Sequence, residues 1–250
     1  MILAIVQARM NSTRLPGKVM KKILRKPLIG YLLERLGKSK KVNKIVIASS
    51  RKRNNDELCK YVKRLGLDVY RGEEDDVLDR YYQAASQFNP DAIVRISGDC
   101  PLIDYKVIDR VISYYLKGNF DYVSNVNPPT YPDGLDTEVF SFKALEEAWK
   151  NAKLKSEREH VTPYIINSGK FKIGNVRAEN DFSSKRWTVD NEEDFILISK
   201  IIENLYKENS YFDMYDILKF ENKNPELFEI NKHIKRNEGL QKSLENDREI

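Results

Sequence analysis

Short apolar runs alternate with helical patterns through the first half of the chain. The runs that resemble buried strands are residues 2–6, 42–49, 69–70, 92–96 and 120–124. Between them, apolar residues recur with helical spacing, which predicts helices over residues 28–36, 58–65, 77–88 and 105–117. Strands that alternate with helices of this length are typical of βαβ units. The pattern therefore predicts an α/β fold in which helices flank a mostly parallel sheet.

The pattern changes after residue 124. Residues 127–134, NPPTYPDG, hold turn formers that cannot continue a central strand. We expect strands near 137–142, 171–177 and 186–189 and a helix over 143–153, and we interpret residues 125–180 as a substrate-facing insertion. From residue 221 the chain is strongly polar. This predicts a helical C-terminal appendage, 221–250, on a single domain that spans residues 1–220.

Charge is distributed unevenly along the chain. The net charge of +5 over 250 residues is too small to indicate a nucleic-acid-binding protein. However, no acidic residue precedes Glu34, whereas that stretch holds Arg9, Arg14, Lys18, Lys21, Lys22, Arg25 and Lys26. So basic a segment should attract a compact anion, and phosphate is the commonest.

Cysteine and histidine usage excludes several classes of protein. Cys59 and Cys100 form no CxxC pair, which fits a reduced, cytoplasmic protein without a zinc knuckle. No run approaches the ~20 apolar residues that a membrane helix needs, so we expect no membrane partner. With two histidines and no GxSxG, HExxH or GxGxxG motif, the common hydrolase, zinc and dinucleotide sites find no support.

The loop that follows the first strand, QARMNSTRLPGK at residues 7–18, is a candidate phosphate site. Backbone N–H groups of such a loop can point at phosphate oxygens, and Arg and Lys add charge-assisted hydrogen bonds. The loop is not a Walker A motif, because Val19 follows Lys18. The alternative is an ordinary solvated basic loop, and the two interpretations are balanced on this motif alone.

Two aspartates follow predicted strands, Asp99 in RISGDCPLID and Asp190 in RWTVDNEED. Magnesium usually takes one or two carboxylates and completes its shell with phosphate oxygens and water, so the pair could hold Mg2+. The alternatives are a turn cap at Asp99 and a helix N-cap at Asp190. The carboxyl ends of strands in such sheets form the ligand site, and the polar motifs converge there.

A third group of polar residues is a candidate acceptor site. It lies in YPDGLDTE and in SEREH further along the chain, and its members are Tyr131, Asp133, Asp136, Glu138, Arg158 and His160. These side chains could bind the hydroxyl or acid groups of a small molecule. The alternatives are turn chemistry for the first motif and a solvated helix start for the second.

Taken together, the motifs resemble one family. They are QARMNSTRLPGK, GEEDDVLDRYY, RISGDCPLID, NPPTYPDGLDTEVFSF, REHVTPYI, RWTVDNEEDF and INKHIKRNEG, in this order. The chain is similar over essentially its whole length to the cytidylyltransferase-like proteins named after spore coat polysaccharide biosynthesis protein F. These are distant relatives of the acylneuraminate and Kdo cytidylyltransferases. The resemblance implies a nucleotide-diphospho-sugar transferase fold of the glycosyltransferase-A type, with a mostly parallel mixed sheet.

The resemblance also implies roles for individual residues. Those matching the nucleotide site are Ala8, Arg9, Ser12, Arg14, Lys18, Ser49, Arg80 and Asp99, of which Arg14, Lys18 and Asp99 would be catalytic. Asp99 and Asp190 match the magnesium ligands, although Cys100 stands where the acid-sugar enzymes carry an acidic or amide residue. The implied reaction transfers CMP from CTP to a small acidic or sugar-like acceptor and releases pyrophosphate.

Two other functions remain open at this point. A glycosyltransferase on the same fold usually carries a DxD motif, and this chain has GDC and VDN instead. A non-catalytic nucleotide-binding protein should lack the basic loop or both aspartates, and neither is missing. A nucleic-acid partner is disfavoured because Glu73–Asp79 places five acids near the candidate site. The acceptor and the oligomeric state stay open, a homodimer included.

Overall fold

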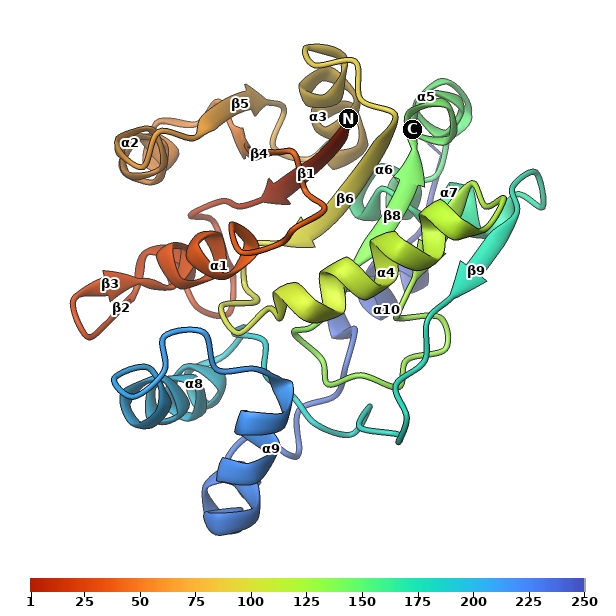
Figure 1. The fold of residues 1–250 in the computed structure, drawn as a ribbon. Helices are drawn as coiled ribbons and strands as arrows, with labels where there is room; N and C mark the ends of the chain where they lie inside the picture. Colours follow the sequence, from red (N-terminus) through yellow and green to blue (C-terminus); the bar gives the residue numbers. More distant parts are fainter. Residues whose placement is uncertain (250) are drawn as a thin grey trace.

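The computed structural model describes residues 1–249 and arranges them around one seven-stranded sheet (Figure 1). The strand order is β5-β4-β1-β6-β8-β7-β9. The strands are β1 (Ile2–Gln7), β4 (Lys44–Ser50), β5 (Asp68–Gly72), β6 (Ala92–Ser97), β7 (Tyr122–Ser124), β8 (Glu138–Ser141) and β9 (Ile173–Asn175). Only β8 runs antiparallel to its neighbours, and every other pair is parallel. The predicted mostly parallel mixed sheet is confirmed.

The helices begin and end close to the predicted residues. They are α1 (Leu28–Leu36), α2 (Asp56–Arg64), α3 (Val77–Ser86), α4 (Tyr105–Lys117), α5 (Phe142–Asn151), α6 (Lys155–His160), α7 (Pro163–Asn167), α8 (Glu192–Leu205), α9 (Met214–Lys223) and α10 (Glu238–Glu245). Local chemistry sets their ends: the carboxylate of Asp104 accepts from the backbone N–H of Lys106 and caps α4, and Gly66, at φ 76°, follows the end of α2. A two-stranded ribbon, β2 (Lys22–Ile23) with β3 (Lys26–Pro27), precedes α1.

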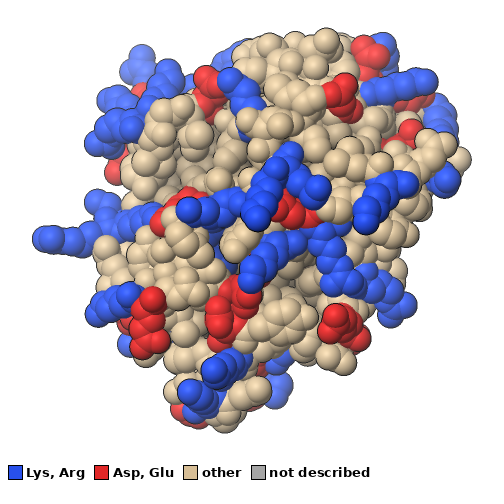
Figure 2. Space-filling model, viewed as in Figure 1, with Lys and Arg blue, Asp and Glu red and all other residues tan. Residues whose placement is uncertain are grey.

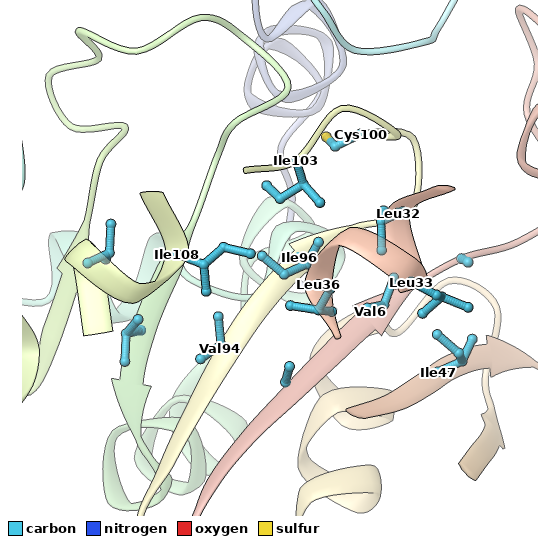
Figure 3. Close-up of a cluster of buried hydrophobic side chains, with 14 of the residues drawn as sticks. Val6, Leu32, Leu33, Leu36, Ile47, Val94, Ile96, Cys100, Ile103 and Ile108 are labelled. Carbon is cyan, nitrogen blue, oxygen red and sulfur yellow. The ribbon is translucent and has the colours of Figure 1, made fainter. Parts of the chain in front are cut away.

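Both faces of the sheet are covered. Along β1, Ala4 and Val6 join a core with α1, α2 and α4, and Leu3 and Ile5 join a second core with α3 and α5. Figure 1 shows α1 and α4 on the near side of the sheet and α5 behind it. Figure 3 shows Leu32 and Leu36 of α1 beside Val6 and Ile96, with Cys100 at the edge of the cluster. The strands are therefore buried on both faces, as their uninterrupted apolar runs indicate.

One predicted strand is wrong. Residues 186–189 form no strand, and only an isolated bridge joins Asp133 to Arg186. Trp187 and Val189 are buried, but in a third core built with α8 and α9 rather than in the sheet. The periodicity of a buried segment is the same in both places, so the apolar run could not separate them.

The second half of the chain also contributes to the sheet and to the surface around it. Residues 125–180, which we interpreted as an insertion, supply β8 and β9, and β8 pairs with β6. Figure 2 shows a band of Lys and Arg side chains across the near face, with Asp and Glu side chains adjoining it. Within residues 1–249, none of the helices has the length and apolarity that spanning a membrane requires.

Candidate active site

The loop after β1 folds back on itself and is anchored to its neighbours. The N–H of Gly17 donates to the carbonyl of Met10 at 2.9 Å, and Gly17 adopts φ 69°, which glycine tolerates best. The N–H of Met10 donates in turn to the side chain of Asn55 at 2.8 Å. These bonds fix residues 8–18 at the carboxyl end of β1, so Arg14 and Lys18 lie above the sheet edge.

Gly98 allows the second motif to approach this loop closely. A Cβ at residue 98 would lie 2.7 Å from the carbonyl oxygen of Gln7 and 2.8 Å from the Cβ of Ala8. The N–H of Gly98 instead donates to that carbonyl at 2.8 Å. Cys100 is buried in the core beneath, where burial raises the pKa of its thiol well above the ordinary value. The residue pair on either side of Asp99 thus positions the carboxylate rather than sharing its chemistry.

Lys18 joins the two aspartates. Its Nζ donates to Asp99 Oδ2 and to Asp190 Oδ1, both at 2.8 Å. Burial alone would lower the pKa of Lys18, but the attraction of the two carboxylates outweighs it and raises the pKa. Burial would likewise raise the pKa of Asp99, and the Lys18 ammonium instead lowers it to about 2. The three groups are therefore fully charged at neutral pH.

Asp190 is free to face this cluster because its neighbours take over the helix start. Asn191, not Asp190, is the N-cap of α8. The buried Asp194 carboxylate accepts from the backbone N–H of Asp190 at 2.9 Å and of Asn191 at 3.1 Å. Arg186 bridges Asp194 and Asp190, with N–O distances of 2.9 Å to each. The N-cap alternative for Asp190 is therefore wrong.

Glu74 ties the basic loop to the segment between β5 and α3, and the sequence analysis missed it. The buried carboxylate accepts from Ser50 Oγ at 2.5 Å and from Asn11 Nδ2 at 3.1 Å, and Arg9 Nη1 lies 3.6 Å away. Burial would raise the pKa of Glu74, but these hydrogen bonds and Arg9 lower it. The local signal, a run of acids at residues 73–76, looked like a solvated segment.

Two cavities adjoin the Lys18 cluster. The first, which we call the basic-loop cavity, has a volume of about 350 Å3. The predicted nucleotide-site residues that line it are Ala8, Arg9, Ser12, Arg14, Lys18, Arg80 and Asp99. Such a volume falls in the usual range for small-molecule sites. The structure therefore brings together all but one of the residues that the sequence assigned to the nucleotide.

The second cavity, which we call the carboxylate cavity, has a volume of about 470 Å3 and shares Asp99 and Asp190 with the first. Four predicted acceptor residues line it, namely Asp133, Asp136, Glu138 and His160. His160 also lines the basic-loop cavity. Burial lowers the pKa of its imidazole, which is neutral at pH 7. Two adjacent cavities that share the aspartates can hold two reactants side by side.

Three predicted site residues line neither cavity. Ser49 is completely buried in β4, and Tyr131 is buried in the third core, where its backbone carbonyl accepts from Arg236. Arg158 donates to the carboxylate of Asp76 at 3.1 Å and to a backbone carbonyl of α5. These contacts are structural, so the placement of Ser49, Tyr131 and Arg158 differs from the one we expected.

The C-terminal segment contributes residues that the sequence analysis did not assign. Glu238, Gly239 and Lys242 line the basic-loop cavity. Glu238 Oε2 accepts from Arg14 Nη1 at 2.9 Å, and Arg236 pairs with Asp136. Both residues belong to the INKHIKRNEG motif, which was the available signal. Far from lying apart, this segment of the predicted appendage forms one wall of the site.

The donor set at Asp99 and Asp190 fits magnesium. Two carboxylates converge on one cation, the Lys18 ammonium, at equal distances. Among residues 1–249, no group of three or more His, Cys, Asp or Glu is placed to hold a metal. A metal held here would therefore complete its shell with oxygens from a ligand and water, which is the usual habit of magnesium.

Comparison with known proteins identifies the family. The chain is 42% identical over 237 residues to an uncharacterised protein of Methanocaldococcus jannaschii, covering 94% of this chain and 96% of that protein. It is 31% identical over 233 residues to the spore coat polysaccharide biosynthesis protein SpsF of Bacillus subtilis, covering 90% and 95%. A solved cytidylyltransferase from Leptospira borgpetersenii superposes with a TM-score of 0.88 at 34% identity, covering 94% and 99%. Residues 3–234 match the family model described as cytidylyltransferase, and the chain belongs to this family.

Proposed function

We propose that the protein transfers CMP from CTP to a small acidic or sugar-like acceptor, with magnesium as cofactor, in surface polysaccharide or related biosynthesis. The observation that carries the proposal is the convergence of Lys18, Asp99 and Asp190 where the two cavities meet. The basic loop offers the cations that a triphosphate needs. The carboxylate cavity offers room for the acceptor on the other side of the same aspartates.

The residues then have distinct tasks. Arg14 and Lys18 bind the triphosphate through charge-assisted hydrogen bonds, and Lys18 exchanges its aspartate partners for phosphate oxygens. An acceptor oxygen attacks the α-phosphorus and forms the new P–O bond. The bond from that phosphorus to the bridging oxygen breaks, pyrophosphate leaves with the electron pair, and the acceptor proton passes to water. Fixed positive groups at the phosphates stabilise the charge that develops in this step.

Asp99 and Asp190 are the residues that would hold magnesium. The ion would neutralise charge on the phosphates when bound. Because the two carboxylates already face one cation, they need little rearrangement to exchange it for another. The loop, with its bonds from Gly17 and Met10, keeps Lys18 at the correct height above them.

Calorimetry with CTP, UTP, ATP and GTP, with and without magnesium, tests nucleotide binding. We expect CTP to bind most tightly and magnesium to tighten it. Lys18→Ala should weaken CTP binding, whereas Lys22→Ala, an exposed lysine outside both cavities, should not. Equal binding of all four triphosphates, or none of CTP, would refute the assignment.

A pyrophosphate-release screen then tests turnover. CTP is combined with acidic sugars, polyols and phosphonates, and we expect release only when a suitable acceptor is present. A glycosyltransferase would instead release a nucleoside diphosphate from a nucleotide sugar. A non-catalytic protein would bind CTP and release nothing with any acceptor.

A further inference from the structure

The carboxylates of the carboxylate cavity already have arginine partners. Asp133 accepts from Arg186 at 2.8 Å. Asp136 is paired with Arg236, and Glu138 with Arg95. Within residues 1–249, each of these guanidinium groups thus faces an acid that neutralises it. An incoming carboxylate would have to displace a protein carboxylate to reach any of them.

The charges around the Lys18 cluster and this cavity are unbalanced in the same direction. The acidic residues are Asp99, Asp133, Asp136, Glu138, Asp190, Asp194 and Glu238. The basic residues paired with them are Arg14, Lys18, Arg95, Arg186 and Arg236. Acids outnumber bases, and a triphosphate adds more negative charge than one magnesium ion removes. A further anion beside them would be repelled.

The rest of the wall suits hydroxyl groups. Its uncharged polar side chains are Ser97, Asn127, Thr162, Asn167, Thr188 and Asn237. Such groups both donate and accept hydrogen bonds, which matches the two-way bonding of a hydroxyl. The side chains of Val126, Ile166 and Leu240 add apolar surface that can pack against a carbon chain. The cavity can therefore bind a hydroxyl-rich molecule without free charge.

We propose that the acceptor of the CMP transfer presents hydroxyl or ammonium groups, and no carboxylate, to this cavity. The inference rests on the proposed function and narrows its acceptor to polyols and amino-polyols. The crowding of acids supports it. Burial, together with the neighbouring Asp133 and Glu138, raises the pKa of Asp136 despite Arg236. An ammonium group placed there relieves this repulsion, and a carboxylate increases it.

The test compares three ligands with one carbon skeleton: glucitol, its amine glucamine and its acid gluconate. Saturation-transfer NMR measures their binding to the protein loaded with magnesium and a non-hydrolysable CTP analogue. We expect glucamine and glucitol to bind at least roughly tenfold more tightly than gluconate, a factor equivalent to 1.4 kcal/mol. Equal or tighter binding of gluconate overturns the inference, as does the absence of binding by all three.

Variants locate the source of the preference. Glu138→Gln keeps an acceptor for the hydroxyls of Tyr122 and Thr162 but releases Arg95, so gluconate should gain relative to glucitol. Asp136→Asn releases Arg236 and should shift the ratio the same way if the first variant does not fold. Glu245→Gln, on an exposed residue of α10, is the matched control. A ratio unchanged in a folded variant contradicts the role of the paired carboxylates.

Failure of this inference differs from failure of the proposed function. Calorimetry with CTP and magnesium is run on the same preparation. A protein that binds CTP and prefers gluconate loses the inference and keeps the proposed function. A protein that does not bind CTP loses the proposed function, whatever the order of the three ligands.

Discussion

Replacing Glu238 with glutamine should raise the affinity for CTP. The Arg14 guanidinium lies 2.9 Å from Glu238 and 3.0 Å from Asp190, and we assign the same group to the triphosphate. Glu238 therefore competes with phosphate for Arg14. Its side chain is 32% exposed, so water and salt weaken the pair. Such partly exposed pairs are worth about 0.2–1 kcal/mol, and their loss should tighten CTP roughly 1.4- to 5-fold.

The assay is calorimetric titration of CTP with magnesium at low and high salt. Glu245→Gln makes the same chemical change on the same helix, at an exposed residue outside both cavities, and should leave the affinity unchanged. The gain from Glu238→Gln should shrink as salt rises, because it is electrostatic. Unchanged or weaker CTP binding in this variant would refute the assignment of Arg14 to the triphosphate.

The remaining predictions concern the Lys18 cluster and its support. Lys18→Ala should weaken CTP binding by roughly 10- to 150-fold, the value of a charge-assisted bond, as measured by calorimetry. Asp99→Ala should lower pyrophosphate release by roughly 10²-fold or more while circular dichroism stays normal, and a near-normal rate would contradict the metal assignment. Chelation of magnesium should weaken CTP binding to the wild type much more than to Asp99→Ala. Asp194→Ala should reduce the free energy of unfolding by about 3–5 kcal/mol in urea titrations, because it leaves Arg186 buried without a main partner.

The first half of the fold could be predicted because its strands are buried on both faces. β1, β4 and β6 read as uninterrupted apolar runs, and the helices between them show clear periodicity. The prediction at residues 186–189 was wrong for the same reason. Trp187 and Val189 are as deeply buried as a central strand, but in the core under α8. Burial was correctly indicated there, and the partner that buries the residues was not.

The candidate site was predicted to the extent that local motifs specify it. Lys18, Asp99 and Asp190 each follow a turn at a strand end or a loop end, and the structure brings them within hydrogen-bonding distance. Arg158 is also a charged residue in a motif, but it is held by Asp76, beyond both cavities. The contact from Arg14 to Glu238 spans 224 residues and leaves no local trace. Pairings of this kind become visible only in three dimensions.

The contact between Arg14 and Glu238 has a consequence for synthesis of the chain. At about 5–20 residues per second, a ribosome needs roughly 11 to 45 seconds to add the 224 residues that separate them. During that interval the basic loop emerges and can fold with β1, β4 and β6, but the wall provided by α10 does not yet exist. The nascent protein thus exposes an open cluster of cations to the nucleotides and nucleic acids around it. Only release of the last residues closes that cluster, which makes completion of the site the final event of folding.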